Sequence, residues 1–438
     1  MARSDGGSVR PRPAPILSKG LLPALAPYLP KHLINRLVAQ SGQLFRVRLY
    51  PPWVTLWGMI YQALSSDKAD RAAVFRIAAW FRVGASIVSG AYCQARQRLR
   101  VEAIEAAAKH VATKAPRTQR ALGNRRIYVL DGSSITLADT EENQARYPQP
   151  SAQKAGCGFP VLHFVALMDH ATGCIVDMLF GDLHIHDARL ARPLWDRLKR
   201  GDILLADRGF ASYGMLVHLK SRGVDVVVRQ HQRQLDRGGC PISYEDGFEV
   251  RVAPKRQPEW WGSDLPRTLR VRIVRCKLSN GKTLILNTLI RKELASAEAL
   301  CELYRSRWRI ETMFGDLKTT LGIEKAMPRT GESAHKTLWA HALAYNLVCR
   351  LLLDVAIGRH VLRDQLSFKN AFRALLDGFD LLAKTLAKAV ERAKDQIAKC
   401  PNLHRPNRSE PRVRKRRPKQ YPLMTRSRAS YATEPQRG

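Results

Sequence analysis

The feature that most constrains the fold is a series of short apolar segments between residues 124 and 229, alternating with helical patterns. IYVLD, ILLAD and VDVVVRQ are typical of buried strands, and VLHFVALMDHATGCIVDMLFGD is typical of a hairpin around a DHATG turn. Amphipathic helices are expected at HDARLARPLWDRLKR and at SYGMLVHLKSRG, the second ended by Gly223. Three strands in a meander, followed by helix, strand, helix and strand, predict an α/β fold with a mixed sheet.

Two carboxylates stand at matching places in this region, because Asp131 ends IYVLD and Asp207 ends ILLAD. A carboxylate is costly inside a sheet, whereas at a strand end it can project into a cleft and meet a hard cation. If the two strands are neighbours, both acids fall within reach of one metal site. The alternative is that each Asp only caps a turn or a helix.

A third acid, Glu311, lies in LYRSRWRIETMFGDLK, within a long helix expected to start at Ser296. At about 100° per residue, four polar side chains share one side of this helix within roughly 60°: Tyr304, Arg307, Glu311 and Lys318. One acid among cationic and hydroxyl donors suits phosphodiester chemistry, in which the acid completes a metal site and the donors hold phosphates. The simpler alternative is an exposed helix with an Arg307–Glu311 salt pair at i,i+4.

The charge balance indicates the class of binding partner. The chain has 73 Lys and Arg against 38 Asp and Glu, which leaves a formal charge of +35. Such an excess predicts attraction to a polyanion and makes nucleic acid the leading partner class. The eight cysteines form no CxxC pair, so neither a zinc ribbon nor a disulfide framework is indicated. The N-terminal MARSDGGSVRPRP lacks the apolar stretch of a signal peptide, and no uncharged run approaches the roughly 18 residues that span a bilayer. We expect a cytoplasmic protein with no membrane partner.

The spacing Tyr304-x2-Arg307-x3-Glu311-x6-Lys318 resembles the Tyr-Arg-Glu-Lys signature of transposases of the insertion-sequence-four family. The blocks YVLDGSSI and ILLADRGF are similar to the first and second catalytic aspartate regions of that family. The resemblance runs from about residue 124 to residue 318, and more loosely over the N-terminal helices, including AYCQARQRL.

This resemblance implies a ribonuclease H-like core in which Asp131, Asp207 and Glu311 are catalytic and bind two divalent ions, usually Mg²⁺ with Mn²⁺ as a substitute. The implied reaction is cut-and-paste transposition: DNA cleavage at the insertion-sequence ends, then strand transfer into target DNA by a two-metal mechanism. Whether excision passes through a hairpin stays open. The implied partners are double-stranded DNA, as terminal inverted repeats and as target, and a second copy of the chain in a homodimeric synaptic complex. Association with the nucleoid follows.

Six residues are expected to contact DNA: Tyr304, Arg307, Lys318, Arg208, Trp260 and Trp261. By resemblance, the first three hold the phosphates of the terminal strand. Trp260 or Trp261 would stack on a flipped base; the alternative is that both rings cover the core of their own segment. Arg208 directly follows Asp207, and either reaches phosphate or pairs with an acid.

Histidines near the predicted strands offer weaker candidates. His184, His186 and Asp187 have the spacing of metal ligands, but a His-Asp pair before an amphipathic helix is more simply a cap. His163 in HFVAL is expected to face the neighbouring strand, and a role in supporting the catalytic residues stays open.

The 104 positions between Asp207 and Glu311 exceed what a ribonuclease H-like core needs there. The surplus contains three strand-like segments, FEVRVAP, TLRVRIVRCKL and TLILNTLI, where the family is known for a β insertion. Near the N-terminus, AAWFRVGASIVSGAYCQARQRLR predicts either a helix–turn–helix or a plain bundle with a basic face. The predicted organisation begins with a flexible N-terminus (1–30) and a helical DNA-binding region (31–123). The first part of the core (124–229), a β-rich insertion (230–291) and the second part of the core (292–357) follow. C-terminal helices (358–400) and a basic disordered tail (401–438) end the chain.

Three other functions compete with transposition. A domesticated, transposase-derived DNA-binding protein without catalysis would tolerate the loss of a carboxylate, yet all three acids are present. A ribonuclease H-like structure-selective nuclease would not need the Tyr-Arg-Glu-Lys residues. A basic RNA-binding scaffold leaves the three acids unexplained.

Overall fold

The computed structural model describes residues 22–45, 49–81, 89–117, 122–230, 241–261, 265–278 and 283–377, with short pieces within 391–399 and at 425–426. The chain divides into two compact units, one formed by residues up to 111 together with 339–401, and the other mainly by residues 112–338. The N-terminus up to residue 21, residues 82–88 within the possible helix–turn–helix, and nearly all of the basic tail lie outside the described residues.

The first unit is helical, as the spacing of apolar residues predicts. Its described helices are α1 (Leu22–Leu25), η1 (Ala26–Tyr28), α2 (Lys31–Gln40), α3 (Pro52–Leu64), α4 (Asp70–Phe81), α5 (Gly90–Arg98), η6 (Arg363–Gln365) and α14 (Phe368–Asp377), together with most of α6 (Val101–Thr113) and α13 (Gly331–Gly358). Two arginines of the possible helix–turn–helix make contacts within this unit. Arg96 pairs with Asp70, and Arg100 Nη1 donates to the Ser41 carbonyl at 2.8 Å.

Among the described helices, α13 alone is long and apolar enough to cross a membrane by length and composition. Its most apolar 18-residue window is 83% buried, which is typical of the core helix of a soluble protein.

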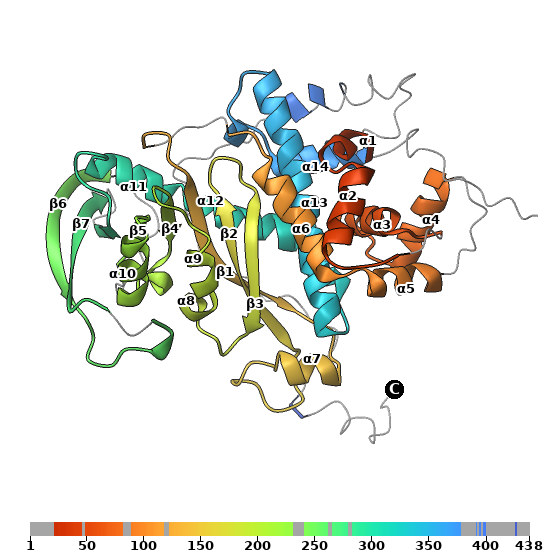
Figure 1. Ribbon diagram of the computed structural model, residues 1–438, viewed down its shortest axis with the longest axis horizontal. Coiled ribbons are helices and arrows are strands. Elements are labelled where there is room, and N and C mark those ends of the chain that lie inside the picture. The colour runs from red at the N-terminus through yellow and green to blue at the C-terminus, as the bar shows by residue number, and fades with distance from the viewer. Residues whose placement is uncertain are drawn as a thin grey trace, which may run out of the picture. The chain divides into compact units, whose positions relative to one another are not determined.

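The second unit contains one sheet of eight strands (Figure 1): β1 (Ile127–Thr136), β2 (Val161–Asp169), β3 (Ile175–Asp182), β4 (Ile203–Ala206), β5 (Asp225–Arg229), β6 (Pro241–Val252), β7 (Thr268–Leu278) and β8 (Thr283–Thr288). Their order across the sheet is β3-β2-β1-β4-β5-β8-β7-β6. β4 is parallel to β1 and β5, and the other pairs are antiparallel, so the predicted mixed sheet is confirmed. The strands expected in a separate insertion continue the same sheet, because β8 pairs with β5.

The second unit also contains short helices: α7 (Glu141–Arg146), α8 (Asp187–Leu190), α9 (Arg192–Trp195), η2 (Arg208–Phe210), α10 (Tyr213–Ser221), η3 (Glu259–Trp261), α11 (Ala297–Arg305), α12 (Trp308–Gly315), the π-helix η4 (Asp316–Thr320) and η5 (Ile323–Ala326). Side chains alternate between the two faces of a strand. Leu130 of β1 and Val165 of β2 therefore share the face that packs against α8, α9 and α10. Ser212 and Ser296 cap α10 and α11 through their side-chain oxygens.

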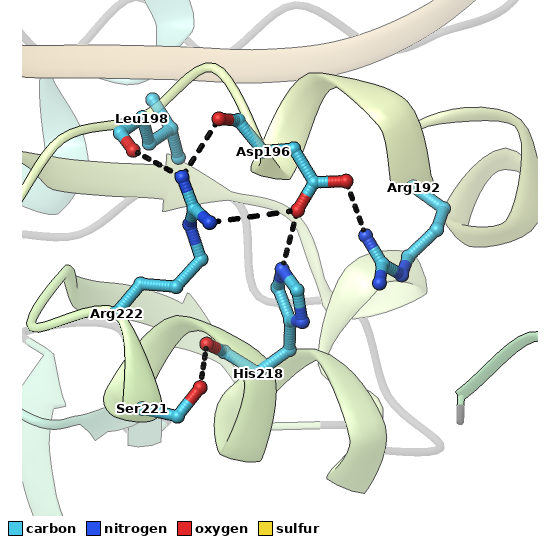
Figure 2. Close-up of polar contacts among 6 residues, drawn as sticks. All are labelled: Arg192, Asp196, Leu198, His218, Ser221 and Arg222. Atoms are coloured by element: carbon cyan, nitrogen blue, oxygen red, sulfur yellow. Dashed lines mark hydrogen bonds and ion pairs between the residues drawn. The ribbon is translucent and has the colours of Figure 1, made fainter. Parts of the chain in front are cut away.

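Hydrogen bonds around Asp196 fasten α9 to α10 (Figure 2). Asp196 Oδ2 accepts from Arg192 Nη1 at 2.8 Å, and Asp196 Oδ1 lies 2.9 Å from His218 Nε2. Arg222 Nη2 donates to the carbonyls of Asp196 and Leu198 at 2.7 and 3.2 Å. The end of α10 is thereby held against the segment that follows α9.

Three local expectations are wrong. β1 does not end at Asp131, because its pairing with β2 continues to Thr136. The helix expected after the hairpin is two short helices, and Pro193, which lacks an N–H donor, lies in the first turn of the second.

The long helix expected from Ser296 is also interrupted. It breaks between α11 and α12, where the Ser306 hydroxyl donates to the Leu303 carbonyl at 2.5 Å and lies 2.6 Å from His170 Nε2. These bonds compete with a continuous helical ladder. After α12 the helix widens into η4, so Lys318 lies on a π-helical turn.

Candidate active site

Asp131 and Asp207 are brought together by the pairing of β1 and β4. The two parallel strands are in register from Ile127 with Ile203 to Leu130 with Ala206. The two acids directly follow this last pair, Asp131 within β1 and Asp207 at the residue before η2. The predicted neighbouring strand positions are thus present, although only β4 ends there.

Glu311 joins the site through Arg307. Arg307 Nη1 lies 3.0 Å from Asp131 Oδ2, and its Nη2 lies 3.2 Å from Glu311 Oε1. The Arg307 side chain is only 7% exposed, whereas Asp131 and Glu311 are 19% and 34% exposed. The i,i+4 pair considered from the sequence is present, and the same guanidinium also reaches β1.

Tyr304 links the remaining acid to the helices. Its hydroxyl donates to Asp207 Oδ1 at 3.3 Å from the last turn of α11. Arg307 and Tyr304 therefore bind the three carboxylates from one side, and all five side chains converge from β1, the end of β4, and the α11–α12 segment.

The carboxylates influence one another electrostatically. Burial raises the pKa of Asp131 to about 6; the Arg307 guanidinium opposes this rise, and the charges of Asp207 and Glu311 add to it. Burial also raises the pKa of Glu311, with Arg307 opposing and Asp207 adding. Buried acids that repel one another favour a neighbouring cation, which at present is the guanidinium of Arg307.

The donor set fits a hard divalent ion by its chemistry. Carboxylate oxygens are the ligands that Mg²⁺ prefers in proteins, and oxygens of Asp131 and Glu311 already converge on one cationic group. In the described part of the chain, no three His, Cys, Asp or Glu side chains stand close enough to share an ion as they are. Arg307 lies between Asp131 and Glu311, so a bound ion would require these side chains to rearrange.

Arg208 and Lys318, also predicted to contact DNA, lie on short helical turns. Arg208 begins η2 directly after Asp207. Lys318 is half-buried on η4, where burial lowers its pKa and the charge of Glu324 opposes the shift.

Trp260 and Trp261 pack against the helices that cover the sheet. The centroid of the Trp260 ring lies 5.9 Å from that of Trp195, and the Trp261 ring lies 6.5 Å from Tyr213. A Cβ at Gly214 of α10 would lie 2.4 Å from Trp261 Cγ, so this ring rests directly on the helix backbone. The rings are thus packed, but against α9 and α10 rather than against the core of their own segment, which was the alternative considered from the sequence.

The structure also shows the contacts of His186, Asp187 and His163, the weaker candidates from the sequence. His186 is the N-cap of α8, and its Nδ1 accepts from the Ala188 N–H at 3.2 Å, as expected for a cap. Asp187 Oδ1 lies 2.8 Å from His163 Nε2 of β2.

Arg229 belongs to the site and was missed from the sequence. It follows Val228, which pairs with Ala206, so it stands level with Asp207 at the end of β5. Arg229 is 7% exposed, and its charge lowers the pKa of Tyr304 against the rise that burial causes. Its position in the sequence could have revealed it. In VDVVVRQ, Arg229 is the charged residue at the end of a buried strand, as Asp131 is in IYVLD and Asp207 in ILLAD.

Comparisons with known proteins identify relatives of this chain. The family model described as a transposase DDE domain matches residues 122–347. The chain is 26% identical to the transposase InsG for insertion sequence element IS4 of Escherichia coli, over 94% of this chain and 96% of that protein. It is 29% identical to a putative transposase, y4zB, of Sinorhizobium fredii, over 38% of this chain and 47% of that protein. A piggyBac transposase, solved as a synaptic complex with hairpin DNA, is similar with a TM-score of 0.43 and 11% identity, over 88% of this chain and 86% of that chain.

Proposed function

The chain belongs to the DDE transposases of the IS4 family, and we propose that Asp131, Asp207 and Glu311 are the carboxylates with which it cleaves and joins DNA. Metal-dependent DNA cleavage and strand transfer are the activity of this family. The observation that carries the assignment is the contact of Arg307 with both Asp131 and Glu311, together with the Tyr304–Asp207 hydrogen bond.

We propose a ribonuclease H-like core for the catalytic unit. The order β3-β2-β1-β4-β5, with the first three strands antiparallel and β1, β4 and β5 parallel, supports it. We keep the domain division expected from the sequence, in which 124–229 and 292–357 form the core and 230–291 is an insertion that adds β6, β7 and β8 to the sheet.

DDE transposases use divalent metal ions, and we propose Mg²⁺, as two ions with Mn²⁺ as a substitute, held by Asp131, Asp207 and Glu311. Such ions lower the pKa of an attacking water or 3′-hydroxyl and stabilise the leaving 3′ oxygen. The charges of Asp207 and Glu311 both raise the pKa of Asp131, and the charge of Asp207 also raises that of Glu311, so the three acids interact with one another. We propose Asp131 as the shared ligand.

The cationic and hydroxyl groups would hold the terminal DNA strand. Arg307 has a planar fork of donors that matches phosphate oxygens as well as carboxylates. We propose that Arg307, Tyr304 and Lys318 contact the phosphates around the scissile bond, and that Arg208, beside Asp207, contacts a neighbouring phosphate. Arg229 is a further candidate because it is buried beside Tyr304 and Asp207.

A base-stacking role for Trp260 or Trp261 remains a proposal. It would require a ring to leave its packing against Trp195 or Gly214, which costs buried area that the stacked base must replace. Excision through a hairpin intermediate rests on that stacking role.

The proposed partners are double-stranded DNA, as the terminal inverted repeats and the target, and a second copy of the chain. The formal charge of +35 supports binding to DNA and association with the nucleoid. A homodimer follows from the need to hold two ends of the element at once.

Single replacement of any of the three acids tests the function. Asp131→Ala, Asp207→Ala and Glu311→Ala should each abolish Mg²⁺-dependent cleavage of the element's terminal DNA while end binding is kept. Cleavage is followed on labelled end DNA, and binding is followed by gel shift in the absence of metal. Wild-type cleavage by any one variant would remove that residue from the catalytic set.

A further inference from the structure

A carboxylate–imidazole pair lies behind Asp131, across the sheet from Arg307 and Glu311. His163 Nε2 of β2 lies 2.8 Å from Asp187 Oδ1 at the start of α8, and His163 is 8% exposed. His163 pairs in register with Ser134 of β1. Because alternate residues of a strand share a face, His163 lies on the face of Gly132, while Asp131 points to the other face.

Gly132 is the point at which this pair meets β1. A Cβ at Gly132 would lie 2.6 Å from Asp187 Oδ2 and 3.2 Å from His163 Cε1. The backbone of Gly132 is outside the positive-φ region, so no unusual conformation requires glycine there. Glycine is required because the Asp187 carboxylate packs directly against the strand backbone.

The Gly132 peptide also reaches the catalytic side of the strand. Its N–H donates to Asp131 Oδ1 at 2.9 Å. The pairing of β1 with β4 stops at Leu130, while its pairing with β2 continues, and β1 is only half-buried from Asp131 to Ser134. This stretch has lost the support of β4, so what packs behind Gly132 affects the position of its peptide.

We infer that Asp187, held by His163, is a positioning residue for Asp131. Its carboxylate fixes the Gly132 peptide, and the N–H of that peptide orients Asp131 for metal binding. The inference rests on the proposed role of Asp131 as a metal ligand. Groups behind a metal ligand that fix its orientation change metal affinity by about 10- to 100-fold when they are removed.

The test compares two replacements at Asp187 with a matched control. Asp187→Ala removes the contact with Gly132, whereas Asp187→Asn keeps the shape of the side chain and an oxygen that can lie beside His163. Asp196→Ala is the control, because Asp196 and His218 form a second Asp–His contact of 2.9 Å in the same unit, on α9 and α10 rather than behind Asp131 (Figure 2). Binding of Mn²⁺ alone to the full-length protein is measured by calorimetry, and cleavage is measured against Mg²⁺ concentration.

Asp187→Ala should weaken Mn²⁺ binding about tenfold and shift the Mg²⁺ requirement for cleavage upward by a similar factor, with metal-free end binding unchanged. Asp187→Asn should restore nearly wild-type metal binding, and Asp196→Ala should leave it unchanged. If Asp187→Ala does not fold, His163→Ala takes its place, since it removes the group that holds Asp187.

Wild-type metal binding by Asp187→Ala, or by His163→Ala in its place, would overturn the inference. Equal weakening by Asp187→Asn and Asp187→Ala would do the same, because it would assign the effect to charge rather than to packing. Asp131→Ala separates this failure from failure of the proposed function: if Asp131→Ala binds Mn²⁺ and cleaves as the wild type does, the metal site itself is misassigned.

Discussion

Two Asp–His contacts in the catalytic unit have nearly the same chemistry and different surroundings. Asp187 and His163 approach to 2.8 Å, and Asp196 and His218 to 2.9 Å. The first pair packs against Gly132, next to a catalytic candidate, with His163 on a buried strand. The second joins α10 to Asp196, the residue that follows α9 (Figure 2). The Asp196 side chain is 50% exposed, against 38% for Asp187.

The difference shows that the pairing itself does not determine the role. An exposed ion pair contributes about 0–1 kcal/mol and acts only on the groups it joins. A pair packed against a strand backbone also fixes that backbone, and here the same peptide donates a hydrogen bond to Asp131. The comparison therefore predicts effects on metal binding for one pair and effects on stability alone for the other.

The largest effect is expected from adding a single methyl group between the first pair and β1. Gly132→Ala places a Cβ 2.6 Å from Asp187 Oδ2 and should destabilise the protein by about 1–3 kcal/mol, the usual cost of overpacking. Cleavage should fall as well, because the peptide that orients Asp131 must move. Urea denaturation and the single-turnover cleavage rate measure the two effects.

Gly209→Ala is the matched control for that change. Gly209 also lies close after a catalytic candidate, Asp207, but a Cβ there would meet nothing within 4 Å. Both quantities should stay near wild type. Equal losses from the two replacements would show that close approach of Asp187 is not what requires glycine at Gly132.

A smaller effect is expected at the second pair. Asp196→Ala removes the acceptor of Arg192 and the partner of His218, and should lower the free energy of unfolding by at most about 1 kcal/mol, because the group is half-exposed. Metal affinity and cleavage should be unchanged. A change in either would mean that α9 and α10 also position the site, and would remove the contrast between the pairs.

The smallest effect concerns the pH dependence of stability. Burial and the charge of Arg192 lower the pKa of His218, with Asp196 opposing. The unfolded chain then binds the proton at higher pH than the folded one, so stability is complete above about pH 6.5 and falls as the pH drops toward the folded pKa. His218→Gln should reduce the slope of Tm against pH in this window. An identical slope would show that His218 does not titrate as its surroundings indicate.

Two other histidines, His335 and His170, also make the stability depend on pH, so part of the slope of Tm against pH remains in His218→Gln. Burial lowers the pKa of His335 to about 4 and that of His170 to about 3. The comparison of His218→Gln with the wild type isolates the second pair from these two groups.

The sequence predicted the strands well because their apolar runs are short, dense and bounded by turns. All eight observed strands overlap segments identified from the pattern, and the acids that end IYVLD and ILLAD stand beside each other as expected. The sequence predicted that Tyr304, Arg307, Glu311 and Lys318 share one side of a continuous helix, and the first three do meet at the acids. The helix is not continuous, however, because the Ser306 side chain bonds to Leu303 and contacts His170, 136 positions away.

By itself, the sequence determined what short-range patterns can encode: the strand segments, the basic charge, the family signature and three candidate acids. Only the tertiary structure decided which groups surround those acids. Arg229 is level with Asp207 because β5 pairs with β4, and Asp187 reaches Gly132 because α8 packs against β2. Such contacts join residues far apart in the chain, and they depend on strand register and close packing, which the spacing of residue types does not specify.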